Sequence, residues 1–257
     1  PSAYFSYTPT QTNFDLSLIS PVLPYNGGGS ALQFNGGHYV SIDSAVGIPD
    51  SNDVYTMAAW IKPSAMGGAK GIIGWGQWGS TNRCNALRIM GNSQIRHYWW
   101  GNDLDVVCGD LTDGWHYIVA LYDGTTRKVF MDGNLLGSDT PSGHNAVMSN
   151  FRIGSTNNGE YFYGVIDEVS VWNIALTQSE IQEVMNYGLN GNEEGLVAYW
   201  DFNEGSGTTV IDQSGNGNNG TVNGATWEVS DTNQDVLLTY DFMLDNWSPT
   251  GTEHLAV

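Results

Sequence analysis

Short runs of alternating apolar and polar residues, separated by turn residues, organise most of this chain. Such alternation is typical of half-buried β-strands, because successive side chains in a strand point to opposite faces. Asp-Gly pairs at 123–124 and 132–133 lie between such runs and predict tight hairpins. We expect strands at residues 31–34, 38–42, 55–62, 71–75, 85–90, 94–100, 115–123, 127–132, 151–154, 163–172 and 196–202. This pattern predicts an all-β fold with two antiparallel sheets packed as a sandwich.

One segment has helical periodicity instead. Thr177 precedes it and Glu180 follows three positions later, as in a capping box. Ile181 and Val184 begin an apolar stripe at helical spacing, and Gly188 is placed to end the helix. We therefore expect a single short helix after the strand at 163–172.

The strand at 163–172 contains an acidic pair within an apolar run. Strict alternation places Glu168 on one face of the strand. It places four residues on the opposite face, Val165, Asp167, Val169 and Val171. A carboxylate on an apolar face needs a partner or an ion, because an unpaired buried charge is costly. Asp167 is therefore a candidate ion ligand.

Charge narrows the range of partners. The chain has 257 residues with 27 acidic and 8 basic side chains, for a net charge of −19. Nucleic acids and anionic lipid surfaces are bound mainly through Lys and Arg, so neither is expected as a partner. No apolar run approaches the roughly 20 residues of a membrane-spanning helix, so we expect no membrane insertion. Residues 1–4 show no leader pattern, so a secretion signal is absent, cleaved or outside this sequence.

The negative charge is concentrated in one part of the chain. Residues 1–153 hold 11 acids and all 8 cations, whereas residues 154–257 hold the other 16 acids and no Lys or Arg. This imbalance favours either bound Ca²⁺, which takes oxygen ligands, or a solvated acidic surface. The charge alone leaves both open.

Two cysteines, Cys84 and Cys108, allow two readings. They fit one disulfide between neighbouring strands in an oxidising compartment, or two separate buried thiols. Neither lies next to a second Cys or a His in a pattern that would predict a metal site.

Aromatic residues gather in two glycine-flanked segments at 74–79 and 96–103. Flat rings are the surfaces on which sugar C–H groups pack, while polar neighbours fix orientation. A strand places His97 and Trp99 on one face and Tyr98 and Trp100 on the other, so at most half of them can meet a ligand. We assign ligand contact to six residues, Trp75, Trp78, His97, Trp99, Asn102 and Asp103. The alternative is that most of these rings belong to the core of the sandwich.

An ordered set of motifs is similar to a known family. These motifs are Ala31-Leu32-Gln33-Phe34-Asn35-Gly36, Tyr55 to Pro63, Gly114-Trp115-His116-Tyr117, Phe130-Met131-Asp132-Gly133, Arg152-Ile153-Gly154, and Tyr163 to Trp172 followed by Ala175-Leu176-Thr177. Together they resemble laminin-G-like members of the concanavalin A-like lectin/glucanase superfamily, which is related to pentraxins. The resemblance implies a two-sheet jelly-roll sandwich that is usually secreted or on the cell surface. It also implies binding of glycans or other surface ligands, often with a structural Ca²⁺.

The resemblance also suggests domain limits. It covers residues 30–187 as a core and extends over the flanks. We expect one domain at 1–230, in which 195–228 provides a closing strand and an Asn/Gly-rich loop. Residues 231–257 would form an extra C-terminal strand or the start of a following element, because 236–242 repeats the pattern of 196–202.

The family's calcium and its catalysis can be compared with this sequence. Related sandwiches hold a carboxylate of the last strand against the end of the first, so the resemblance points to a calcium site made by Asp167, Asn203, Gly205, Asp212 and Asn216. The alternative for Asp212 and Asn216 is a role in Asx turns. Retaining glucanases of this superfamily need a Glu-x-Asp-x-x-Glu strand, and no such pattern occurs in this chain.

We therefore expect a non-catalytic extracellular module that binds a glycan or polysaccharide. Two alternatives remain at this point. One is a module that binds a surface protein or acts as an adhesion spacer, and the other is a polysaccharide-active enzyme with unrecognised chemistry.

Overall fold

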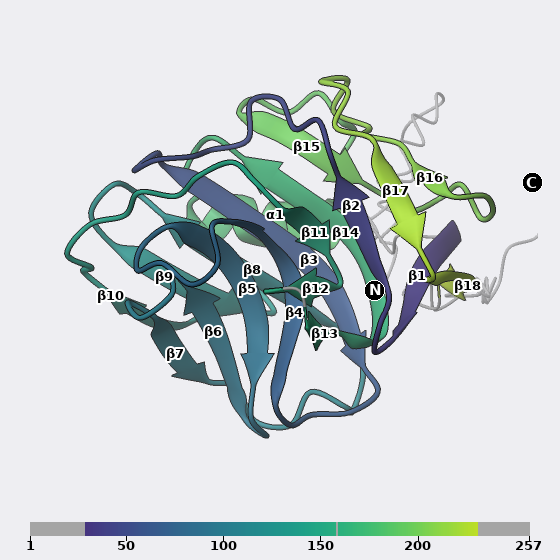
Figure 1. Cartoon of the computed structure of the whole chain (residues 1–257). Coiled ribbons are helices and arrows are strands. Elements are labelled where there is room, and N and C mark those ends of the chain that lie inside the picture. The colour runs from purple at the N-terminus through teal and green to yellow at the C-terminus, as the bar shows by residue number, and fades with distance from the viewer. Residues whose placement is uncertain (1–28, 158, 231–257) are drawn as a thin grey trace, which may run out of the picture.

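The computed structural model describes residues 29–157 and 159–230, which form two stacked β-sheets and one helix (Figure 1). Each sheet has eight strands, and an additional two-stranded hairpin lies beside them. The expected antiparallel two-sheet sandwich is therefore confirmed. The expected elements within 1–28 and 231–257 lie outside the described residues.

Sheet A includes the two strands that precede and follow the helix in the sequence. Its order is β10-β9-β8-β3-β14-β1-β18, and β15 pairs with the far part of β14. All its pairings are antiparallel. Its strands are β1 (Gly29–Asn35), β3 (Tyr55–Pro63), β8 (His116–Tyr122), β9 (Arg127–Met131), β10 (Asn134–Asp139), β14 (Tyr163–Trp172), β15 (Leu196–Trp200) and β18 (Thr226–Ser230).

Sheet B faces the viewer in Figure 1. Its order is β16-β17-β2-β11-β4-β5-β6-β7. The hairpin β12 (Ser155–Thr156) and β13 (Glu160–Tyr161) leaves sheet B after β11 and packs against β4. The strands of sheet B are β2 (Tyr39–Ile42), β4 (Ala69–Gly76), β5 (Cys84–Met90), β6 (Gln94–Tyr98), β7 (Leu104–Val107), β11 (Phe151–Ile153), β16 (Thr209–Val210) and β17 (Gly220–Asn223).

The main core lies between the two sheets. It contains alternate apolar residues of both layers, such as Phe34 and Met57 of sheet A and Ile73 and Leu87 of sheet B. A second apolar cluster lies on the outer face of sheet A, where α1 (Gln178–Tyr187) covers the strands. Figure 1 shows α1 on the far side of the molecule, beyond β3 and β14. In the described residues, no helix is long and apolar enough to cross a bilayer.

The local signals for the turns and the helix are confirmed. Asp132 and Gly133 join β9 to β10 with φ angles of +49° and +73°, which is the conformation of a two-residue primed turn. The hydroxyl of Thr177 accepts a hydrogen bond from the backbone N–H of Glu180, whose carboxylate accepts one from the backbone of Thr177. The capping box therefore starts α1 as predicted.

Strict alternation along β14 is wrong because the strand contains a bulge. The register against β3 shifts between Asp167 and Ser170, and Glu168 has a φ of +51°. One extra residue reverses the facing of everything beyond it. As a result, Ile166 joins Val169 and Val171 in the core between the sheets.

The segment after α1 contributes to both sheets. Strand β15 pairs with β14, β17 pairs with β2, and β18 pairs with β1. The domain limits at 1–230 and 231–257 stay a prediction, because they involve residues 1–28 and 231–257, which lie outside the described residues.

Candidate functional site

The outer face of sheet B carries polar and aromatic side chains, and no helix covers it among the described residues. Cross-strand pairing joins Arg152 to Gly74, Gly74 to Ala86 and Ala86 to Tyr98 in one row. Adjacent strands lie about 4.8 Å apart, so three steps separate the backbones of Arg152 and Tyr98 by about 14 Å. This row is the axis of the candidate site.

The middle of the row has no large side chain. A Cβ atom added at Gly74 would lie 2.5 Å from the Cβ of Ala86, so the close approach of the two strands excludes a larger residue there. Larger side chains stand only at the two ends of the row. Gly74 is buried and Ala86 has no exposed surface, so neighbouring side chains cover the middle of the row.

At one end of the row, three rings form what we call the aromatic cluster, Trp78, Tyr98 and Trp100. The Tyr98 ring stacks at 6.2 Å from that of Trp78 and lies 5.7 Å from that of Trp100. Tyr98 is only 6% exposed, whereas both tryptophans are half-buried. The two indoles thus keep ring surface exposed on this face while Tyr98 supports them.

Arg88 and the β12–β13 hairpin border the aromatic cluster. The guanidinium of Arg88 lies 3.5 Å from the ring centre of Tyr98 and forms an ion pair with Glu160 of β13. The Thr156 hydroxyl donates a 2.7 Å hydrogen bond to the same carboxylate. The hairpin is thereby attached to the outer face of sheet B.

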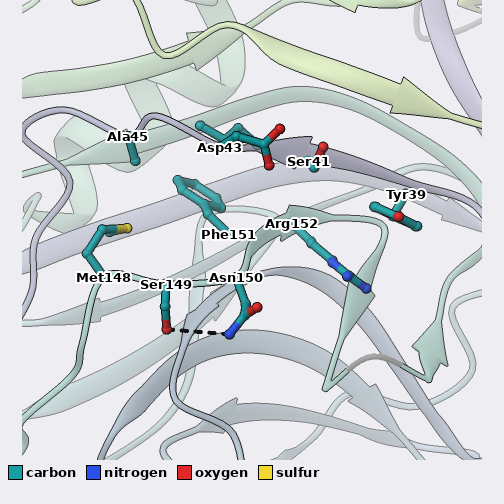
Figure 2. Close-up of a pocket in the computed structure, with 10 residues that line it drawn as sticks. Tyr39, Ser41, Asp43, Ala45, Met148, Ser149, Asn150, Phe151 and Arg152 are labelled. Carbon is teal, nitrogen blue, oxygen red and sulfur yellow. Dashed lines mark hydrogen bonds between the residues drawn. The ribbon is translucent and has the colours of Figure 1, made fainter.

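At the other end of the row, a pocket of about 420 Å³ lies over β2 and β11 (Figure 2). Its polar lining includes Tyr39, Ser41, Asp43, Asn150 and Arg152. Residues 39, 41 and 43 alternate with core residues, so their side chains point outward. The arrangement offers hydroxyl, amide, carboxylate and guanidinium groups around one cavity.

Three of the predicted ligand residues belong instead to the core, so their assignment is wrong. Trp75, His97 and Trp99 have no exposed surface. The indole N–H of Trp75 donates to the carbonyl of Pro49, and that of Trp99 donates to the Tyr55 hydroxyl. Sheet A covers this side of sheet B, so the rings facing it cannot reach a ligand.

The burial pattern along β6 shows which of its residues point outward, away from the core. Ile95 is buried and Arg96 is half-buried with an ion pair to Asp105, so even-numbered residues point outward. Tyr98 and Trp100 follow this parity. Likewise, the charged Arg152 between two apolar residues of β11 marks an outward position that the sequence analysis did not assign.

Of the other predicted ligand residues, only Trp78 is in the aromatic cluster. Asp103 accepts a hydrogen bond from the backbone of Trp99 and lies 3.3 Å from the guanidinium of Arg96. The side-chain amide of Asn102 donates to the side chain of Asn82, and the backbone carbonyl of Asn102 accepts from Arg127. Asn102 and Asp103 therefore hold the turn after β6.

Buried histidines lie beneath the site. His97 Nε2 is hydrogen-bonded to the Tyr55 hydroxyl, and His144 stacks on Trp99 at 3.8 Å. Burial lowers the pKa of His97 well below its usual value, and burial lowers the pKa of His144 to about 4. Both rings are neutral at physiological pH and support the sheet from inside.

Of the two alternatives for the cysteines, the structure has the separate thiols and not the disulfide. Cys84 begins β5, whereas Cys108 follows β7, with β6 between them. Two strand steps amount to about 10 Å, beyond the reach of a disulfide. Burial raises the pKa of both thiols, that of Cys108 to about 11, so both stay protonated at neutral pH.

The predicted calcium ligands fall into two groups. Asp167 is 1% exposed, and its carboxylate accepts hydrogen bonds from the Glu168 N–H at 2.9 Å and the Ser230 hydroxyl at 2.6 Å. Burial raises its pKa well above the usual value, and the nearby charges of Glu168 and Asp201 add to the effect. Asn203 reaches the same end of β1, because its side-chain oxygen accepts from the Ser30 N–H.

Gly205 lies close to this first group as well. A Cβ atom added at Gly205 would lie 3.0 Å from the hydroxyl oxygen of Ser30, the residue whose N–H is bonded to Asn203. The described residues contain no cluster of three or more His, Cys, Asp or Glu side chains placed to hold a metal ion. Any cation at this end of β1 would thus depend on one buried carboxylate together with amide and carbonyl oxygens.

The second group, Asp212 and Asn216, organises its own loop. The Asp212 carboxylate accepts hydrogen bonds from the backbone N–H groups of Tyr199, Ser214 and Asn218, at 3.0, 3.0 and 2.8 Å. The Asn216 amide donates to the carbonyl of Val197. The contact from Ser214, two residues after Asp212, is an Asx turn, which was the alternative for this pair.

With the fold and the face in view, comparison with known proteins places the chain in a family. A family model described as the concanavalin A-like lectin/glucanases superfamily matches residues 34–182, more than half of the chain. The chain belongs to this superfamily. The match begins in β1 and ends in α1, so it contains both the row on sheet B and the pocket.

Solved structures share the fold of this superfamily member. A candidate carbohydrate-binding protein from Bacteroides ovatus superposes with a TM-score of 0.66 at 24% identity, covering 79% of this chain and 60% of the other. A heptameric SAP-like pentraxin from Limulus polyphemus gives 0.56 at 13% identity, covering 80% of this chain and 97% of the pentraxin. The chain thus spans about 60% of the Bacteroides protein. No curated protein matches the chain.

Proposed function

We propose that this superfamily member is a non-catalytic carbohydrate-binding module that holds a glycan along the outer face of sheet B. The observation that carries the proposal is the aromatic cluster, where the half-buried Trp78 and Trp100 lie on Tyr98. Sugar rings pack on such faces through their C–H groups, and polar groups nearby fix their orientation. The Bacteroides ovatus structure, named for carbohydrate binding, is consistent with this role.

Binding without cleavage is supported by two of the acids on this face. Glu160 is engaged by Arg88, and Asp105 makes a bidentate pair with Arg96. A retaining mechanism needs two free carboxyl groups about 5–5.5 Å apart on either side of the scissile bond. Prolonged incubation with a bound polysaccharide should therefore release no new reducing ends, and release by the purified module would contradict this part of the proposal.

Two single substitutions test the site. Trp78→Ala and Trp100→Ala should each weaken binding to the glycans that the wild type selects from an array by about tenfold or more, because an aromatic anchor is lost. Trp115→Ala is a matched control, since this half-buried tryptophan lies over Lys62 of sheet A. It should leave affinity unchanged in isothermal titration.

The result is decisive only for folded variants, so circular dichroism accompanies each titration. Wild-type affinity in both Trp78→Ala and Trp100→Ala would show that the aromatic cluster is not the site. A module that only spaces other domains, or that binds a surface protein, would bind no glycan on the array. We further propose that the module acts outside the cell, where polysaccharides and surface glycans are found.

The proposal includes one structural calcium ion at Asp167, with Asn203 and Gly205 providing further oxygen atoms. A cation there would offset a buried carboxylate that has acidic neighbours, Glu168 and Asp201. Chelation should lower the melting temperature of the wild type, since a metal that binds only the native state stabilises it. Asp167→Asn should abolish this response and Asp212→Asn should retain it; an unchanged melting temperature after exhaustive chelation would refute the ion.

A further inference from the structure

Arg152 has no acidic partner in the described part of the chain, unlike three other arginines of the two sheets. Arg88, Arg96 and Arg127 are each paired with a carboxylate. Among the described residues, no carboxylate lies within ion-pair distance of Arg152, although the chain has 27 acidic side chains and a net charge of −19. Within the same described range, Arg83 also has no carboxylate partner, but its guanidinium donates a 2.9 Å hydrogen bond to the side-chain oxygen of Gln77. Arg152 is distinguished by its place in the lining of the pocket.

Tyr39 holds this guanidinium in place. The guanidinium carbon of Arg152 lies 4.2 Å from the ring centre of Tyr39, a cation–π distance. Contact with a ring uses the flat face of the guanidinium and leaves its N–H edge free for a bidentate acceptor. Figure 2 shows Arg152 and Tyr39 at the same end of the pocket, with Met148 at the other end.

The surrounding pocket has the dimensions and polarity of a small-molecule site. Its volume of about 420 Å³ lies within the range of pockets that enclose small ligands. Ser41 offers a hydroxyl, and the Asn150 amide is held by a 3.3 Å hydrogen bond to the carbonyl of Gly76, which leaves its side-chain oxygen toward solvent. Asp43 is exposed and adds the one negative charge among the lining residues.

We propose that this pocket recognises a sugar unit bearing a single carboxylate or sulfate, and that Arg152 binds the acidic group. This inference rests on the proposed function, because the rest of the glycan would extend from the pocket toward the aromatic cluster. A dense polyanion would be repelled by the net charge of −19, whereas one acidic group beside one unpaired guanidinium is matched.

The test uses matched oligosaccharides that end in glucuronate, galacturonate or a sulfated sugar, each paired with its uncharged counterpart. Titration of the wild type should give at least tenfold tighter binding to the charged member of a pair. Arg152→Gln should lower that affinity to the level of the uncharged member and leave the uncharged member unchanged. The carboxylate and sulfate pairs distinguish the two sources of charge.

Two further variants act in predicted directions. Arg152→Lys should recover part of the preference, since it keeps the charge but loses the planar fork. Asp43→Asn should strengthen binding of the charged sugar by a few fold, because a repelling carboxylate is removed, and should not change the uncharged one. Neither Arg152 variant is expected to unfold the protein, since the side chain is half-buried, and circular dichroism checks this.

The outcomes separate this inference from the proposed function. Equal wild-type affinity for charged and uncharged members would overturn the acidic-sugar inference and leave the aromatic cluster standing. An unchanged preference in Arg152→Gln would do the same. Absence of binding to both kinds of sugar would overturn the proposed function, and the inference with it.

Discussion

The outer faces of the two sheets are built differently. That of sheet A is apolar, and residues such as Tyr117, Phe130 and Trp172 are buried there under Leu176 and Ile181 of the helical segment. That of sheet B carries arginines, half-buried tryptophans and a polar pocket. The same sandwich core lies behind both faces, so the core does not decide which face is covered. The helix stabilises one face and leaves the other available to a ligand.

The largest effect that tests this contrast is expected at Ile181, the fully buried residue of α1. Ile181→Ala should lower the free energy of unfolding by about 2–5 kcal/mol, because it leaves a cavity under the helix. Urea denaturation followed by tryptophan fluorescence measures this. Glycan affinity of the folded variant should stay that of the wild type; a parallel loss would mean that the two faces are coupled.

A second effect concerns pH and the histidines of the two sheets. Burial lowers the pKa of His144, beneath sheet B, to about 4, whereas Asp132 and Asp113 raise the pKa of His116 in sheet A. The stability that neutral His144 contributes is complete above its unfolded pKa near 6.5 and is lost as the pH falls toward 4. The loss should reach about 3 kcal/mol, because each unit of pKa shift is worth about 1.4 kcal/mol.

The histidine prediction is isolated by comparison with His144→Gln. The difference in unfolding free energy between wild type and variant should narrow as the pH falls from 7.5 to 4. Only in the wild type does unfolding expose a ring that takes up a proton in this pH range, and this uptake favours the unfolded state. NMR titration provides the direct check, and His116 should titrate above the pH at which His144 does. A normal titration of His144 near pH 6.5 would contradict its burial.

The smallest effect is expected at the N-cap of α1. Thr177→Ala should cost about 1 kcal/mol, because the backbone N–H of Glu180 loses its acceptor. Thermal denaturation is sensitive enough to detect it. Thr177→Ser is the matched control, since it keeps a hydroxyl in the capping position and should restore most of the stability.

Much of the fold can be read from local chemistry. Alternation predicts the strands because one face of each must be buried, and the Asp132-Gly133 turn and the Thr177–Glu180 capping box are specified by residues within four positions of each other. The same local rules pointed to the segments 74–79 and 96–103, which contain the three rings of the aromatic cluster. They did not show which alternate residues of 96–100 face outward and which face the core.

The choice between faces depends on what lies opposite. His97 and Trp99 are buried because sheet A packs over them, and Tyr98 and Trp100 face outward for the same reason. The bulge at Glu168 reverses the facing of β14, and nothing in a strict period of two foretells an inserted residue. Separation of Cys84 from Cys108 likewise follows from the position of β6 between their strands.

By itself, the amino-acid sequence determined eleven of the eighteen described strands, the capped helix and the excess of negative charge, because each depends on neighbouring residues or on composition. Only the tertiary structure decided which rings reach the surface, which acids are paired, and that Arg152 stands beside Tyr39 without a carboxylate partner among the described residues. These outcomes depend on contacts between segments far apart in the chain, and a single sequence does not specify the register and stacking that bring those segments together.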